Sequence, residues 1–407
     1  MRLAKVGMGA MLLMASTVAS LGQQQKPEPV LIGINIPRTG PAAPLGALGE
    51  PAIRLAVDQI NASGGIKSLG GAPIELRWAD NQANPSVSTT EEQRLIQREN
   101  VSLVIGGLSS AAEFTATQTA ERLKVPHIVG VAASNALTER GFKYIFMVSA
   151  RAIDYVRGFV DVLNYLRDDR KIPLKRVVIL TENSPYGSSF AKDLVSMTKA
   201  AGYEVADNIE YAMTTSDVAP ILTRIRALNP DVVLHVGFIG DSILMWNTRR
   251  QLGMEDIPFI GITSGVGSPS FIKAVGPAAN QALTLSQTNS DIPNDAIKTF
   301  VQNYRARHNV EPENNGFFSY QAVYVAKAAL EKAASRKPED IRNALATLDL
   351  RSDVVLPTPV IKFGETGANE NNKVILLQIR DGKLVTVWPK TVATQQPDLK
   401  QFDKLKK

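Results

Sequence analysis

Apolar and polar positions alternate along the chain in a repeating rhythm of strand-like runs and helix-like segments. Val30–Ile36 is a continuous run rich in β-branched residues, which is typical of a strand buried on both faces. Apolar residues then recur at helical spacing from Ile53 to Ile60, and Ile74–Ala79 alternates as a second strand. Strands and helices in this order predict parallel pairing with right-handed crossovers.

The same rhythm restarts after Ser149–Ile153 and predicts a second sheet. Its strands are predicted at Arg176–Leu180, Tyr203–Asn208, Asp231–Val236 and Pro258–Ile262. Near the C terminus, Lys373–Trp388 contains two apolar strands around an Asp381-Gly382 turn signal, which predicts a hairpin. The pattern therefore predicts an α/β protein with two doubly wound parallel-sheet lobes.

One predicted junction between a strand and a helix carries candidate chemistry. In Val101–Ala111 an apolar run ends at Gly106-Gly107, and a helical pattern begins at Ser109-Ser110. The first amides of a helix lack intrahelical partners and lie at the positive end of its dipole, so an anion can bind there, and the glycines allow close approach. Alternatively, Ser110 and Glu113 form a capping box that satisfies the same amides internally.

Composition narrows the class of protein. The 407 residues suffice for roughly two or three domains, and 44% hydrophobic with 21% charged residues is typical of a globular chain rather than a disordered one. The 45 basic and 39 acidic residues are interspersed, which favours a solvated surface and argues against a nucleic-acid partner. Cysteine is absent, so the chain forms no disulfide and relies on its core.

The N-terminal segment, Met1–Gly22, has the features of a cleaved signal peptide. Arg2 and Lys5 provide a basic start, Val6–Met14 is apolar, and small residues follow. No later apolar run reaches the eighteen or so residues that cross a bilayer. We therefore expect a mature periplasmic chain with no transmembrane helix and, because no cysteine follows the signal, no lipid anchor.

Catalytic and metal-binding motifs are missing from the sequence. His127, His235 and His308 show no metal-ligand spacing, and a nucleophile elbow, a phosphate loop and a dinucleotide fingerprint are all absent. His127 and His235 lie in apolar strands, where a satisfied core histidine is the expected role. Paired carboxylates could still meet in space. We expect no enzyme, no catalytic residue, no metal and no cofactor.

Several motifs follow one another in a characteristic order over nearly the whole mature chain: GINIPRTGPAAPLG, AVDQINASGGI, VIGGLSS, ALTE, ENSPYG, NPDVV and DGKLVTVWP. This order resembles the periplasmic solute-binding proteins of ABC importers, of the branched-chain amino acid type. The resemblance implies a type I periplasmic binding fold, with two α/β lobes joined by three crossover strands that close around one small molecule. It also implies a membrane permease as partner, for which a monomer is suited.

The resemblance further implies where the lobes begin and end. The crossings would fall near Val148, Leu285 and Pro357. A signal peptide would occupy residues 1–22, the N-terminal lobe residues 26–148 plus 286–356, and the C-terminal lobe residues 149–285 plus 357–390. Residues 391–407, rich in Gln and Lys, are expected to form a flexible tail.

Candidate ligand-binding residues follow from the same resemblance. The carboxylate clamp of the family corresponds to Ser110, with Ser109 beside it, and to the loop that holds Val131, Ala133 and Ser134. This agrees with the anion site inferred above from the helix N-terminus.

On the other side of the predicted cleft, Tyr186 corresponds to an aromatic residue that contacts the ligand, although it could instead pack within its own turn. Phe238 takes a second aromatic position and lacks a hydroxyl, and Leu45 stands where the family often has tyrosine. Arg38 could bind a carboxylate in a bidentate contact, but a solvated loop arginine is the commoner case.

In the members of the family that bind amino acids, an acidic residue binds the α-ammonium of the ligand. Ser264 is the residue of this chain that aligns nearest to that position. A buried ammonium without a carboxylate partner is costly, and Leu45, Phe238 and Ala133 make the predicted pocket more apolar. We therefore expect a carboxylate with an apolar or aromatic body at least as readily as leucine, isoleucine or valine. A ligand-sensing receptor of the same fold is the alternative function, and a secreted hydrolase a weaker one.

Overall fold

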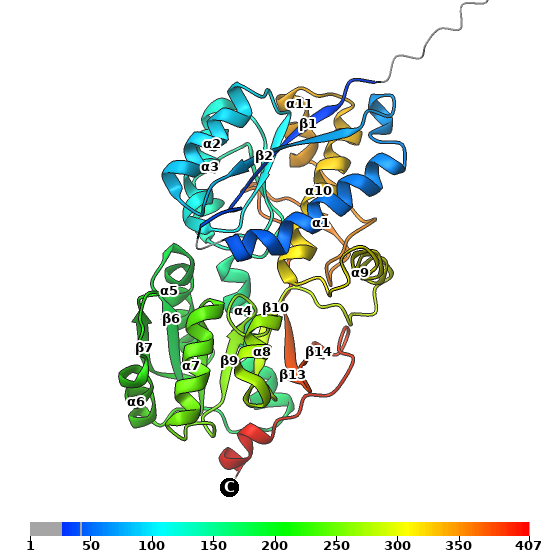
Figure 1. Ribbon diagram of the computed structural model, residues 1–407. Coiled ribbons are helices and arrows are strands. Elements are labelled where there is room, and N and C mark those ends of the chain that lie inside the picture. The colour runs from blue at the N-terminus through cyan, green and yellow to red at the C-terminus, as the bar shows by residue number, and fades with distance from the viewer. Residues whose placement is uncertain (1–26, 41–42, 407) are drawn as a thin grey trace, which may run out of the picture.

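The computed structural model describes residues 27–40 and 43–406, apart from the side chains of residues 44 and 45. The expected signal peptide, residues 1–22, lies outside the described residues. Figure 1 shows two α/β lobes placed end to end, with the chain passing between them. Within the described residues, no helix has both the length and the apolar character needed to cross a membrane.

The N-terminal lobe is built on a five-stranded parallel sheet in the order β2-β1-β3-β4-β5. Its strands are β1 (Val30–Ile36), β2 (Ile74–Asp80), β3 (Leu103–Gly106), β4 (His127–Val129) and β5 (Ile145–Met147). The helices of this lobe are α1 (Ala43–Ala62), α2 (Pro85–Gln97), α3 (Ser110–Leu123), α9 (Asp295–His308), α10 (Asn314–Ala333) and α11 (Pro338–Ala346). Side chains of β1 are buried on both faces of the sheet, as its continuous apolar run predicts.

The C-terminal lobe is built on a seven-stranded sheet in the order β14-β13-β10-β9-β8-β6-β7. Its strands are β6 (Arg176–Glu182), β7 (Glu204–Tyr211), β8 (Val232–Val236), β9 (Phe259–Ile262), β10 (Leu283–Ser286), β13 (Ile375–Arg380) and β14 (Lys383–Trp388). Its helices are α4 (Ala152–Asn164), α5 (Pro185–Ala200), α6 (Ala219–Leu228), α7 (Ile239–Gln251) and α8 (Pro269–Val275). The pairing is parallel from β7 to β10, whereas β13 and β14 form the predicted antiparallel hairpin.

The hairpin turns at Asp381 and Gly382, which have φ angles of 48° and 74°. Two consecutive residues with positive φ are characteristic of the turns that join antiparallel strands tightly. The two parallel-sheet lobes and this hairpin confirm the predicted α/β fold class.

The chain crosses between the lobes after β5, after β10 and before β13. The third crossing lies at residues 369–374 and not near Pro357. Ile361 and Phe363 are buried in the core of the N-terminal lobe, where the ring centroids of Phe146 and Phe363 are 5.3 Å apart. These apolar side chains hold residues 357–368 against the N-terminal lobe, whereas the resemblance implies that they belong to the C-terminal lobe.

The C-terminal segment also differs from the expected flexible tail. Phe402 is fully buried in the core of the C-terminal lobe. The side chain of Gln378, in β13, accepts the amide of Asp398 at 2.9 Å and donates to the Asp398 carbonyl at 2.6 Å. The Gln and Lys content of residues 391–407 suggested a loose chain, but this apolar anchor and these amide contacts fasten it to the sheet.

Candidate functional site

The N-terminus of α3 faces the other lobe and carries Ser109 and Ser110. Ser109 is the residue that caps the helix, with φ −109° and ψ 118°, and its Oγ accepts the amide of Ala112 at 3.4 Å. The alternative capping box between Ser110 and Glu113 is wrong, because the carboxylate of Glu113 points into the protein and binds His127. Within the described part of the chain, the amides of Ser110 and Ala111 meet no acceptor.

A fully buried cluster of Glu92, His127 and Glu113 lies directly behind this helix terminus. The Nδ1 atom of His127 is 2.9 Å from Glu92 Oε1, and its Nε2 atom is 2.7 Å from Glu113 Oε2. Burial alone would lower the pKa of His127, but the two carboxylates outweigh burial and raise it to about 10. Burial raises the pKa of Glu113, and the contact with His127 offsets part of that increase. The histidine is thus a satisfied core residue that joins α2, β4 and α3.

Two different structural constraints require glycine at the two positions before α3. A Cβ at Gly106 would lie 2.7 Å from His127 Nε2 and 2.8 Å from Glu113 Oε1, so only glycine fits in front of the buried cluster. Gly107 has φ +101°, which a side chain would disfavour. Both glycines therefore fix the path of the backbone into the helix terminus.

The loop after β4 lies against the same terminus. The amide of Ser134 donates to Ser110 Oγ at 3.3 Å, and the amide of Val131 donates to the Gly107 carbonyl at 3.0 Å. Ser110, Ala133 and Ser134 are buried, and Val131 is half-buried against the core of the lobe. The structure thus brings together the predicted residues of the N-terminal lobe, apart from Leu45 and Arg38.

The predicted residues of the C-terminal lobe form a second group. The Tyr186 hydroxyl is 2.8 Å from Ser264 Oγ, and Ser264 donates to the Gly237 carbonyl at 2.8 Å. The ring of Tyr186 lies 5.1 Å from that of Phe238 and 5.2 Å from that of Phe190. Tyr186 therefore does more than pack within its own turn, because it joins α5 to the first residues of α7 and to the loop after β9.

Two acidic residues, neither of them among the predicted site residues, lie next to this group. Glu182 accepts the amides of Ser184 and Gly187, each at 2.6 Å, and is fully buried at the end of β6. Asp241 accepts the amide of Phe238 at 2.8 Å and the hydroxyl of Tyr211. Burial raises the pKa of Asp241, and the Tyr211 hydroxyl offsets part of this. Both carboxylates are engaged in holding the start of a helix.

The two groups meet where the lobes touch. Ser134 Oγ lies 2.8 Å from the Oγ of Ser189, which belongs to α5 in the opposite lobe. Ser189 follows Tyr186 by three residues, so the two lie on neighbouring positions of one helix face. The helix terminus of one lobe and the aromatic group of the other therefore lie on the two sides of one interlobe contact.

Arg38 and Leu45 are placed differently. The guanidinium of Arg38 makes a bidentate contact with Glu50, at 3.0 Å and 3.2 Å, and lies 5.1 Å from the ring centroid of Trp78. The carboxylate that Arg38 binds thus belongs to its own chain. The expected loop over residues 38–46 is shorter than predicted, because α1 begins at Ala43; Leu45 lies in the first turn of this helix, and its side chain lies outside the described residues.

Comparison with known proteins agrees with this architecture. Residues 29–383 match the model of the family described as periplasmic binding protein. The chain belongs to this family. The family is one of solute-binding proteins rather than enzymes, in agreement with the expectation from the missing catalytic motifs.

Individual members of the periplasmic binding protein family are similar along their full length. The chain is 28% identical over 410 residues to the Leu/Ile/Val-binding protein homolog 8 of Brucella abortus, covering 97% of this chain and 98% of that one. The branched-chain amino acid transporter substrate binding protein LivJ from Streptococcus pneumoniae, in complex with isoleucine, superimposes with a TM-score of 0.77 at 23% identity, covering 89% and 100% of the two chains. A solute binding protein of an ABC transporter from R. palustris, in complex with benzoate, also gives 0.77, at 22% identity, covering 90% and 98%. These likenesses confirm the type I periplasmic binding fold.

Proposed function

We propose that the chain is the extracytoplasmic substrate-binding component of an ABC importer, and that it binds a small carboxylate between its lobes and delivers it to a membrane permease. Its family membership supports the general role. The relatives named above as Leu/Ile/Val-binding, and those in complex with isoleucine or benzoate, support a carboxylate as the ligand.

The observation that carries the proposal is the terminus of α3. The amides of Ser110 and Ala111 lie at the positive end of a fourteen-residue helix, and the hydroxyls of Ser110 and Ser134 lie beside them. Such amides bind a carboxylate without a lysine or arginine. The carboxylate of the ligand is proposed to bind here, with Ser109 fixing the helix terminus and Val131 and Ala133 shaping the adjoining loop.

The aromatic group of the C-terminal lobe supports an apolar or aromatic ligand body. The rings of Tyr186 and Phe238 pack against each other, and the Tyr186 hydroxyl is already bonded to Ser264. Tyr186 lies three residues before Ser189, which makes the interlobe contact. Glu182 and Asp241, the acids next to this group, are bonded to backbone amides and so are engaged already. An α-ammonium placed near Ser264 would therefore lack an acidic partner, which favours an amine-free acid over a plain α-amino acid.

A thermal-unfolding screen tests the proposal on mature protein freed of ligand by unfolding and refolding. Benzoate represents the amine-free acids, benzamide is its uncharged isostere, and leucine, isoleucine and valine represent the amino acids. A ligand at a hundred times its Kd stabilises the folded state by about 2.7 kcal/mol. We expect benzoate to stabilise the chain and benzamide not to. Equal stabilisation by benzamide would contradict an anion site, and stronger stabilisation by leucine would contradict the amine-free preference.

Export and delivery need separate measurements. N-terminal sequencing of the protein released by osmotic shock tests cleavage near residue 22 and a periplasmic location. Light scattering of the purified chain tests whether it is a monomer. Loss of uptake of the identified ligand in cells lacking this chain, with uptake restored by the intact gene, tests delivery to a permease.

A further inference from the structure

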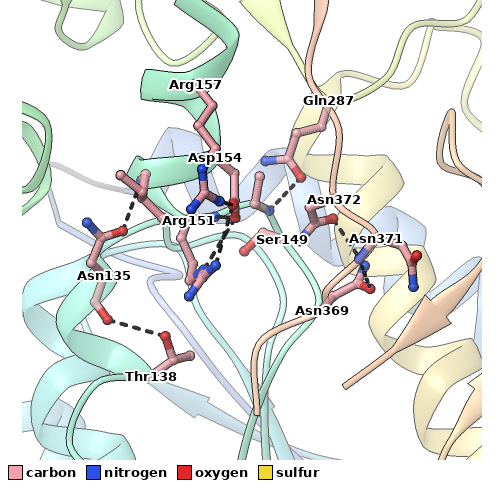
Figure 2. A network of polar contacts seen from close by, with 12 residues as sticks. Asn135, Thr138, Ser149, Arg151, Asp154, Arg157, Gln287, Asn369, Asn371 and Asn372 are labelled. Carbon is pink, nitrogen blue, oxygen red and sulfur yellow. Dashed lines mark hydrogen bonds and ion pairs between the residues drawn. The ribbon is translucent and has the colours of Figure 1, made fainter. Parts of the chain in front are cut away.

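Amide side chains brace the three crossings between the lobes. Gln287, in the second crossing, accepts the amide of Ala150 from the first at 2.7 Å, and donates to the Tyr155 hydroxyl of α4 at 2.9 Å. Asn372, in the third crossing, donates to the carbonyl of Val148 at 3.2 Å. Figure 2 shows these amides gathered around the first crossing, with Asn135 on the opposite side of the network. The crossings thus form one braced hinge.

The loop with the candidate anion site is joined directly to this hinge. The carbonyl of Ala133 accepts the amide of Ala152 at 2.6 Å, and the carbonyl of Ala132 accepts the hydroxyl of Ser149 at 2.8 Å. These partners lie within a few residues of the first crossing. Their separation from the loop changes little when one lobe rotates about the hinge, because they are close to the axis of rotation.

Asn135 is the one residue of the loop whose side chain reaches two elements of the C-terminal lobe. Its Oδ1 accepts the amide of Ile153, in the first turn of α4, at 3.0 Å (Figure 2). Its Nδ2 donates to Asp193 Oδ2, on α5, at 3.3 Å. Asn135 itself is buried, and Asp193 is half-buried. One carboxamide thus holds the hinge with its oxygen and the facing lobe with its nitrogen.

The two bonds of this carboxamide respond differently to a rotation of the lobes. The bond to Ile153 lies at the hinge, whereas the bond to Asp193 joins α5 across the interlobe contact. Asp193 follows Ser189 by four residues, so both lie on the face of α5 that meets the loop. A rotation that separates the lobes would break the contacts of Ser189 and Asp193, whereas the contact of Ile153 would persist.

We propose that Asn135 is a positioning residue that couples the anion-binding loop to lobe closure, through a latch made by its Nδ2 atom and the Asp193 carboxylate. The latch adds to the proposed function and rests on it only for the role of the loop. Because Asn135 directly follows Ser134, a ligand bound at the loop and a formed latch would favour the same arrangement of the lobes. Conversely, a broken latch favours the open form and weakens ligand binding without removing any contact of the site.

The substitution Asn135→Asp tests the latch with almost no change in shape. The aspartate keeps an oxygen for the amide of Ile153 but sets a second carboxylate against Asp193, so attraction becomes repulsion. The double variant N135D/D193N exchanges the two groups and restores one donor and one acceptor. If Asn135 had only a structural role, the second substitution would not restore the properties of the unsubstituted chain.

The interlobe distance is measured by spin labels on cysteines introduced at the exposed Thr90 of α2 and Lys199 of α5, since the chain has no cysteine of its own. In ligand-free protein we expect N135D to lengthen this distance and N135D/D193N to return it to that of the unsubstituted chain. An unchanged distance in N135D, or a distance that stays long in the double variant, would overturn the proposal.

Two further measurements keep the test decisive. Asp193→Ala removes the acceptor from the half-buried side, so it should also lengthen the distance even if N135D fails to fold; a normal distance in D193A overturns the latch. With benzoate as the probe, N135D should weaken binding about tenfold, within the usual range of coupling between sites. The distances are measured without ligand, so they test the latch independently of binding. Absence of benzoate binding would contradict the proposed function but would not contradict the latch.

Discussion

The hydroxyl of Tyr186 lies 2.8 Å from the Oγ of Ser264, and Ser264 in turn donates to the carbonyl of Gly237. Since the hydrogen of Ser264 is used by that carbonyl, the tyrosine hydroxyl must donate to the serine oxygen. Burial raises the pKa of Tyr186 well above its ordinary value, so this hydroxyl stays protonated. The hydroxyl is therefore bonded within the lobe, so we expect the ring, and not the hydroxyl, to be the part of Tyr186 that contacts a ligand.

Two substitutions of Tyr186 should separate the ring from the hydroxyl. Tyr186→Phe keeps the ring face and should change the affinity for benzoate by less than about threefold. Tyr186→Ala removes the ring and should weaken binding by one to two orders of magnitude, because a buried aromatic contact is typically worth about 1.5–3 kcal/mol. Isothermal titration measures both affinities. Equal losses in the two variants would show that the hydroxyl, and not the ring, binds the ligand.

A substitution at Ser264 should change the ligand preference from an amine-free acid toward an amino acid. Ser264→Asp places a carboxylate beside Tyr186 and can pair with an α-ammonium, so leucine or isoleucine should gain affinity relative to benzoate by tenfold or more, about 1.4 kcal/mol. Ser264→Asn has similar volume without the charge and serves as the matched control. The ratio of the two affinities in a titration is the measurement. A gain in S264N as large as that in S264D would rule out an effect of charge.

Neighbouring serines at the terminus of α3 should have different roles. Ser110→Ala removes a hydroxyl beside the proposed carboxylate site and should weaken binding of the acid about tenfold, within the usual energy of a hydrogen bond to a charged group. Ser109→Ala removes the cap and should lower the free energy of unfolding by about 1 kcal/mol. Affinities from titration and unfolding midpoints in urea separate the two effects. A reversed pattern would place the ligand contact at Ser109.

Arg38 should contribute little to ligand binding. Its guanidinium is held by Glu50 in a bidentate pair, and the arginine side chain is 39% exposed. Arg38→Ala should leave the affinity for benzoate unchanged within about threefold, and the free energy of unfolding should fall by no more than about 1 kcal/mol, as is usual for exposed ion pairs. Titration and urea unfolding of the variant check both values. A tenfold loss of affinity would instead indicate that Arg38 contributes to ligand binding.

Periodicity predicted the fold because long apolar runs are local signals. The runs at β1, β8 and β9 needed no tertiary information, and neither did the turn signal at Asp381-Gly382. Residues 357–368 and 391–407 were misplaced for the opposite reason. A few apolar anchors decide where these segments pack: Ile361 and Phe363 in the first, and Leu399 and Phe402 in the second. Two apolar residues in an otherwise irregular segment show no period that indicates which lobe they pack against.

Some features of the candidate site could likewise be predicted from the sequence, and others could not. Ser109, Ser110 and Ser134 could be predicted to lie together because a helix terminus has a sequence signature and the family resemblance supplied the second loop. Glu182 and Asp241 were missed because a buried acid at the end of a strand has the same sequence pattern as a solvated one. Their role depends on amides that turn back toward them, at Ser184 and Phe238. Only the folded backbone shows that these acids are engaged.

The buried cluster of Glu92, His127 and Glu113 behind the N-terminus of α3 should give the protein a characteristic pH dependence. His127 has a pKa of about 10, above its ordinary value of 6.5, so the folded chain keeps a proton that the unfolded chain has lost. Its contribution is complete below about pH 6.5 and is lost as the pH rises toward 10, and the free energy of unfolding falls with pH by at most about 1.4 kcal/mol for each unit. The raised pKa of Glu113 acts in the same direction, beginning above its ordinary value of 4.5.

His127→Gln removes the cation between two buried carboxylates. We expect it to lower the free energy of unfolding near pH 7 by about 3–5 kcal/mol and to flatten the fall between pH 6.5 and 10. Urea unfolding at several pH values measures both effects. His235→Gln is the matched control: burial lowers the pKa of His235 to about 4, so that histidine is already neutral over this range and its loss should leave the slope unchanged. If H127Q kept the slope of the unsubstituted chain while H235Q lost it, the titrating cluster would lie in the C-terminal lobe and not beneath α3.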